Sequence, residues 1–96
     1  MHAVVGPFSG NGAHELVDVL ERRKAEIERL VGSISGFVSY YFVRTDDGGF
    51  SVSVYEEEVG TGENVRIARD WIAKNVGSVG GPAPIVSEGT VIVQLQ

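Results

Sequence analysis

Two segments of the chain are apolar along nearly their whole length and rich in β-branched and aromatic residues. They are VSYYFV at residues 38–43 and VIVQL at residues 91–95. A strand with one face in water alternates apolar and polar side chains, and these two segments hardly alternate. Two helices can cover only one face of a four-stranded sheet, so a second copy of the chain is the simplest cover for the other face. The sequence therefore predicts a homodimer that packs through its sheet faces.

The predicted elements follow the order strand, helix, strand, strand, helix, strand. Apolar residues recur at helical spacing from Ala13 to Val31, and again over residues 64–76 with Thr61 as a candidate N-cap. Aspartates and glycines at 46–49 predict a tight hairpin. The expected strands are residues 2–5, which Gly-Pro should end, then 37–44 and 50–56, and a last strand contained in residues 85–95. Gly77 and residues 80–82 should end the second helix. This order predicts an α+β, ferredoxin-like βαββαβ fold with two helices on one face of an antiparallel sheet.

Composition narrows the class of protein. The 96 residues suffice for one domain, which we expect to span 1–96. There are no cysteines, which excludes disulfides, thiolate metal sites and a cysteine nucleophile. A net charge of −5 disfavours a nucleic-acid partner because phosphate backbones would be repelled. No window is long and apolar enough for a membrane span, and the first ten residues do not look like a signal peptide. We therefore expect a cytoplasmic protein.

A small-molecule pocket is predicted on the face of the third strand that carries Tyr55. Ser51 and Ser53 share this face, so small side chains leave room beside a polar phenol tip. Trp71 on the second helix and His2 on the first strand are the other candidate ligand-binding residues. Each has a simpler alternative: a half-buried strand for Tyr55, a core position for Trp71 and a frayed terminus for His2.

The sequence offers no recognisable cofactor site. Its two histidines, His2 and His14, have no carboxylate partner at metal-ligand spacing, so no metal is expected. The glycine clusters match neither the dinucleotide-binding nor the phosphate-binding loop pattern. Arg44 could anchor an anion, or it could be an ordinary surface charge near the hairpin.

The segment SISGFVSYYFVRT at residues 33–45, followed by a hairpin and VSVYEE at residues 52–57, resembles the antibiotic biosynthesis monooxygenase-like proteins. The resemblance implies a dimeric α+β barrel, with two sheets face to face and a pocket in each subunit between sheet and helices. Members include cofactor-independent quinol-type oxygenases and haem-degrading enzymes. The haem-degrading branch uses an asparagine on strand one, a tryptophan ending strand three and a histidine on helix two. Here strand one has no asparagine, Tyr55 ends strand three, and residues 64–76 contain no histidine, so haem ligation of that type is not expected.

Two functions stay open at this point. In the first, the protein is a cofactor-independent monooxygenase acting on a small aromatic or quinol-like molecule. In the second, it is a non-catalytic binding or accessory module that uses the same pocket for a small apolar or aromatic ligand. Catalytic residues cannot be named, because a proton shuttle inside an apolar pocket would have to come from His2 or the tyrosines.

Overall fold

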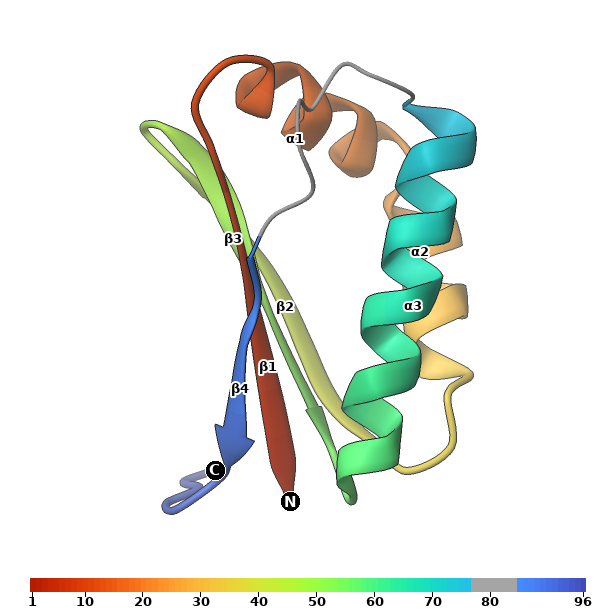
Figure 1. Ribbon diagram of the computed structural model, residues 1–96, viewed down its shortest axis with the longest axis vertical. Helices are drawn as coiled ribbons and strands as arrows, with labels where there is room; N and C mark the ends of the chain where they lie inside the picture. Colours follow the sequence, from red (N-terminus) through yellow and green to blue (C-terminus); the bar gives the residue numbers. More distant parts are fainter. Residues whose placement is uncertain (77–84) are drawn as a thin grey trace.

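Four antiparallel strands form one sheet, and the helices cover one of its faces (Figure 1). The computed structural model describes residues 1–76 and 85–96. The strand order is β2-β3-β1-β4, in which β1 pairs with both β3 and β4 and β3 pairs with β2. The elements are β1 (His2–Ser9), α1 (Ala13–Arg22), α2 (Lys24–Gly32), β2 (Phe37–Thr45), β3 (Gly48–Tyr55), α3 (Glu58–Asn75) and β4 (Ser87–Thr90). The predicted α+β, ferredoxin-like fold is confirmed.

The first predicted helix is two helices, α1 and α2, and the expectation of one continuous helix is wrong. The break lies at Arg23, whose backbone leaves the helical region with φ −110° and ψ 26°. The apolar periodicity already lapses there, because Leu20 and Ile27 are seven residues apart with only charged residues and one alanine between them. The Arg23 guanidinium bonds Glu26 and lies 5.0 Å from the centre of the Trp71 ring. The bend therefore has partners on both α2 and α3.

The first strand runs through Gly6 and Pro7 to Ser9, which corrects its expected end at Val5. β4 pairs with residues 2–5 of β1, and beyond Val5 no strand of the described residues pairs with that side of β1. Proline lacks a backbone donor and is tolerated where no neighbouring strand needs that donor.

The last strand and the second predicted helix also differ from expectation. β4 covers residues 87–90, inside the segment 85–95 that was expected to contain the last strand. The apolar residues 91–95 lie outside β4, so the expectation that they form a strand is wrong. α3 begins at Glu58, and Thr61 is buried inside its first turn rather than capping it. The glycines and proline expected to end this helix, at 77 and 80–82, lie outside the described residues. No helix in the described part of the chain is long and apolar enough to cross a membrane.

The core lies between the sheet and the helices in two neighbouring clusters. One cluster joins Leu16 and Leu20 of α1 to Trp71 of α3 and to Val76. The other joins Val31 and Ile34 to Tyr55 at the end of β3; these clusters share Ile27 as a partly buried neighbour. None of the helices α1, α2 and α3 covers the opposite face of the sheet (Figure 1).

Candidate functional site: a groove between strand β2 and the helices

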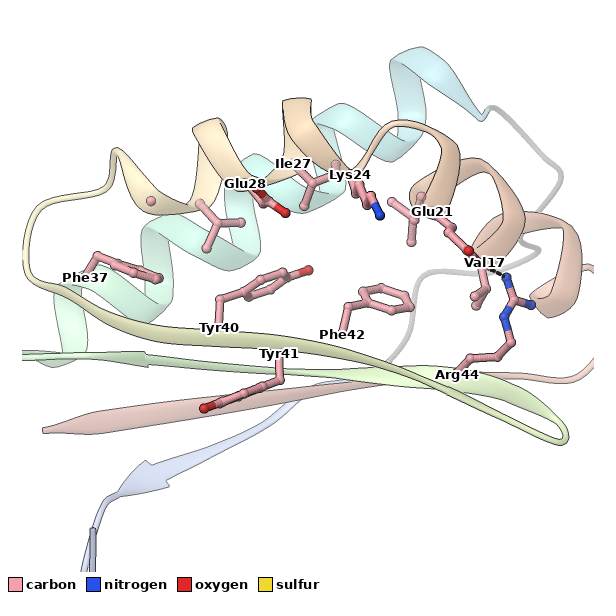
Figure 2. A pocket seen from close by; sticks show the side chains of 13 residues that line it. Val17, Glu21, Lys24, Ile27, Glu28, Phe37, Tyr40, Tyr41, Phe42 and Arg44 are labelled. Carbon is pink, nitrogen blue, oxygen red and sulfur yellow. Dashed lines mark hydrogen bonds and ion pairs between the residues drawn. The ribbon is translucent and has the colours of Figure 1, made fainter. Parts of the chain in front are cut away.

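A groove of about 580 Å³ lies between β2 and the helices α1 and α2 (Figure 2). This volume falls within the range of small-molecule sites in proteins. Strand β2 is at the edge of the sheet, so within the part of the chain that the structure describes no further strand closes the groove on that side. Its lining residues are Val17, Leu20, Glu21, Lys24, Ile27, Glu28, Val31, Gly32, Phe37, Tyr40, Tyr41, Phe42 and Arg44.

Three aromatic rings from β2 form the floor of the groove. Tyr40 and Phe42 rise from the strand toward the helices, whereas Tyr41 points to the opposite face of the sheet (Figure 2). A β-bulge between Phe37 and Ser39 shifts the alternation by one residue, so Phe37 joins Tyr40 and Phe42 on the helix face. The sequence could show that Tyr40 and Tyr41 face opposite ways, but the bulge left no recognisable signal.

The phenol of Tyr40 is the polar group on this aromatic floor. Burial raises the pKa of Tyr40 to about 12, and the nearby Tyr55 adds to the shift. At neutral pH the Tyr40 hydroxyl therefore keeps its proton and can donate a hydrogen bond. A group with this pKa does not serve as a general base near neutrality.

Charged side chains line the helix side and one end of the groove. Lys24 and Glu28 reach down from α2 toward the aromatic floor (Figure 2). Neither forms an ion pair with any residue that the structure describes. Arg44 of β2 bonds Asp18 at 3.0 Å and Glu21 at 2.7 Å, which ties the strand to α1. Arg44 is thus an exposed, paired surface charge that also lines the groove, and its role as an anion anchor stays a prediction.

A second, smaller cavity of about 50 Å³ lies deeper between the sheet and α3. It shares five lining residues with the groove: Leu20, Ile27, Val31, Tyr40 and Phe42. Trp71 and Asn64 line the small cavity from α3, and Ser51 lines it from β3.

Ser51, Ser53 and Tyr55 lie on the side of β3 that meets the helices, and Ser51 lines the small cavity. That this face forms a ligand pocket stays a prediction. Tyr55 is completely buried. Its hydroxyl donates to the carbonyl of Val31 at 3.1 Å and accepts from the Asn64 amide at 3.2 Å. Burial is the main cause that raises the pKa of Tyr55. Tyr55 lies behind the groove and does not line it.

Trp71 and His2, the other two predicted site residues, lie apart from each other. Trp71 is 6% exposed, lines the small cavity and donates its indole proton to Glu26 at 2.7 Å. His2 lines neither space; its Nδ1 is 2.8 Å from the Thr61 hydroxyl oxygen. That Tyr55, Trp71 and His2 contact a ligand stays a prediction, while the groove adds Tyr40, Lys24 and Glu28, which sequence reasoning did not select.

Comparison with known proteins identified solved structures that have a similar fold. No protein-family model and no curated protein matches the chain. A protein of unknown function from Nitrosomonas europaea superposes with a TM-score of 0.68 at 16% identity, over 99% of this chain and 92% of that one. A monooxygenase from Streptomyces coelicolor in complex with nanaomycin D gives 0.60 at 15% identity, over 99% and 88%. SnoaB, a cofactor-independent oxygenase from Streptomyces nogalater, gives 0.59 at 12% identity, over 99% and 94%.

At these identities the likeness shows a shared fold. The expected resemblance to monooxygenase-like α+β proteins is therefore confirmed at the level of fold. What these proteins bind is not carried to this chain by the fold alone, because one fold supports many functions.

Proposed function

We propose that this protein is a cofactor-independent monooxygenase acting on a small aromatic or quinol-like molecule, which binds in the groove between β2 and the helices. The observation that carries the proposal is the aromatic floor with one protonated phenol, Tyr40, beneath Lys24 and Glu28, which form no ion pair within residues 1–76 and 85–96. Flat apolar walls suit an aromatic ring, and a few polar groups set its orientation. The likeness in fold to a cofactor-independent oxygenase and to a monooxygenase with a bound ligand supports the same class.

The chemistry needs a substrate that supplies every electron. A quinol and O₂ can give a hydroxyquinone and water: one oxygen atom enters the ring and the other leaves as water. The quinol ring provides all four electrons, so the balance closes without a cofactor. Before it reacts with O₂, the substrate has to lose a hydroxyl proton to a base.

The groove contains groups for each part of this reaction. Glu28 is the carboxylate in position to accept the substrate proton, since it reaches into the groove and has no cationic partner among the described residues. Lys24 lies beside it on the same helix and would stabilise the resulting phenolate. Tyr40 would donate a hydrogen bond to a substrate oxygen. Phe37 and Phe42 would pack against the ring.

We also propose that residues 1–96 act as one domain of a homodimer that packs through the open sheet faces. Val5, Tyr41 and Val43 on this face are 37%, 64% and 38% exposed. The C-terminal segment 91–95 adds side chains that are almost fully exposed, including Ile92 at 92%. A stable interface of about 800 Å² per subunit would bury these apolar groups.

Oxygen consumption tests the catalytic proposal directly. Purified protein is mixed with a panel of dihydroxyaromatic compounds, and O₂ uptake is followed together with quinone absorbance. We expect enzyme-dependent uptake that falls in Glu28→Gln and Tyr40→Phe. Glu57→Gln is the matched control for Glu28→Gln, because it removes an exposed carboxylate that does not line the groove. If all variants consumed O₂ at the same rate as the unmodified protein, the groove would be excluded as the reaction site.

The alternative is a non-catalytic binding or accessory module that uses the same groove. Titration of the same compounds, followed through Trp71 fluorescence and calorimetry, separates the two. Saturable binding that weakens in Tyr40→Phe, without any O₂ uptake, would favour this alternative. Absence of both binding and uptake would contradict both functions.

A further inference from the structure

Three elements meet at the end of the sheet where the chain begins. The start of β1, the end of β4 and the first turn of α3 all lie at the lower end of the molecule in Figure 1. Each contributes one side chain of a type that binds metal ions: His2 from β1, Glu88 from β4 and Glu58 from α3. None of these residues lines the groove or the small cavity.

The strand register explains why His2 and Glu88 share a face. His2 pairs with Thr90 and Val4 pairs with Glu88 across the β1–β4 ladder. Paired residues of antiparallel strands lie on the same face, and Val4 is buried on the helix face. Glu88 is thus the diagonal neighbour of His2 on that face, with its Oε1 3.8 Å from His2 Nδ1.

Helix α3 supplies the third side chain and holds the imidazole. Thr61 lies against His2, with its hydroxyl oxygen 2.8 Å from Nδ1. An ion bound at Nδ1 would take the place of this hydrogen bond. Glu58 is three residues earlier on α3, hence on the same side of the helix as Thr61. Thr61 is fully buried, and the His2 side chain is only 14% exposed, so the ring is packed in place.

We propose that His2, Glu58 and Glu88 bind a divalent transition-metal ion such as Zn²⁺. One ligand atom from each residue lies within 4.8 Å of the other two. Metal–ligand bonds of about 2.0–2.2 Å require only a small further approach, which two exposed glutamate side chains can make. Two carboxylates balance the charge of the ion, and the imidazole favours zinc over the all-oxygen preference of Mg²⁺ or Ca²⁺.

The ion would join β1, β4 and α3, and three protein ligands would leave coordination positions open to water. The short strand β4 pairs through only four residues, so a metal bridge at its end would stabilise it. Sequence spacing showed no metal site because each ligand comes from a different element: residues 2, 58 and 88 converge only through the fold.

Calorimetric titration of tag-free protein with Zn²⁺ and, separately, with Mg²⁺ tests the proposal. We expect stoichiometric Zn²⁺ binding, a higher melting temperature with Zn²⁺ and no comparable effect of Mg²⁺. His2→Gln and Glu88→Gln should each weaken Zn²⁺ binding by more than about tenfold. Removing a residue that only orients a metal ligand already costs about that much affinity, and these two residues would bind the ion directly.

Two matched variants control for charge and residue type. His14→Gln removes the other histidine, and Glu57→Gln removes an exposed glutamate next to Glu58. Both should bind Zn²⁺ like the unmodified protein. The proposal is overturned if Zn²⁺ does not bind stoichiometrically or if His2→Gln and Glu88→Gln bind Zn²⁺ like the unmodified protein. It is also overturned if the two control variants lose as much affinity for Zn²⁺ as His2→Gln and Glu88→Gln lose. The groove plays no part in this experiment, so its result is independent of the proposed oxygenase function.

Discussion

Two glycines in α3, two residues apart, have opposite surroundings and allow a sharp test of how this helix packs. A Cβ on Gly60 would lie 2.7 Å from both Cβ and Cγ of Tyr55 and 2.9 Å from its Cδ1. A Cβ on Gly62 would have no atom within 4 Å. Gly60→Ala therefore forces the helix against a ring, whereas Gly62→Ala adds a methyl group in open space.

Tyr55 cannot easily yield to the added methyl group. Its side chain is completely buried, and its hydroxyl is fixed by the Val31 carbonyl and the Asn64 amide. Overpacking of this kind costs about 1–3 kcal/mol. Replacing glycine by alanine inside a helix returns at most about 1 kcal/mol. We expect Gly60→Ala to lower the free energy of unfolding by about 1–2 kcal/mol and Gly62→Ala to raise it by about 0.5–1 kcal/mol.

Urea unfolding followed through Trp71 fluorescence measures both changes. The chain concentration must be held constant, since a dimer gains stability with concentration. The gain in helix propensity is common to the two variants, so their difference in unfolding free energy isolates the clash at about 1–3 kcal/mol. If Gly60→Ala proved as stable as Gly62→Ala, the close packing of α3 on Tyr55 would be refuted.

Two further predictions concern assembly and alkaline stability. In analytical ultracentrifugation the protein should sediment at twice the chain mass. Val52→Asp should dissociate or unfold the dimer, because an unpaired charge in the sheet interface costs several kcal/mol. A stable, well-folded wild-type monomer would contradict this prediction. The pKa of Tyr40 is raised to about 12, so its contribution to stability is complete below pH 10 and is lost as the pH rises through about 12. Tyr40→Phe should make that alkaline loss shallower in pH-dependent urea unfolding; an identical profile would show that Tyr40 ionises normally.

The topology could be predicted because local signals agreed with one another. Alternating residues in β3, the Asp-Asp-Gly-Gly hairpin and the two helical periodicities each pointed to the same βαββαβ order. The hairpin glycine confirms this agreement: Gly48 has φ 146°, and a Cβ there would lie 2.2 Å from the Phe8 carbonyl oxygen. Such a position accepts only glycine, so the turn could be predicted from the sequence.

Features that depend on tertiary contacts could not be predicted from the sequence. Pro7 was expected to end β1 because the sequence does not reveal that β4 stops pairing at Val5. The bulge that turns Phe37 toward the helices follows from pairing with β3, and the break at Arg23 follows from contacts with α2 and α3. The groove depends on all of these, which is why Tyr55 was selected from its strand pattern and Tyr40 was not.

The apolar character of both faces of β2, from which the homodimer was predicted, has two separate explanations in the proposed assembly. Tyr40 and Phe42 form the groove floor, whereas Tyr41 and Val43 lie on the open face. A second copy seated on the open face leaves the groove uncovered, because the groove opens between β2 and the helices. Substitutions at Tyr40 should therefore change ligand binding without changing the oligomeric state, and polar substitutions at Val43 should first change the oligomeric state. Coupling between the two would mean that the partner subunit reaches around the edge of β2 and takes part in the site.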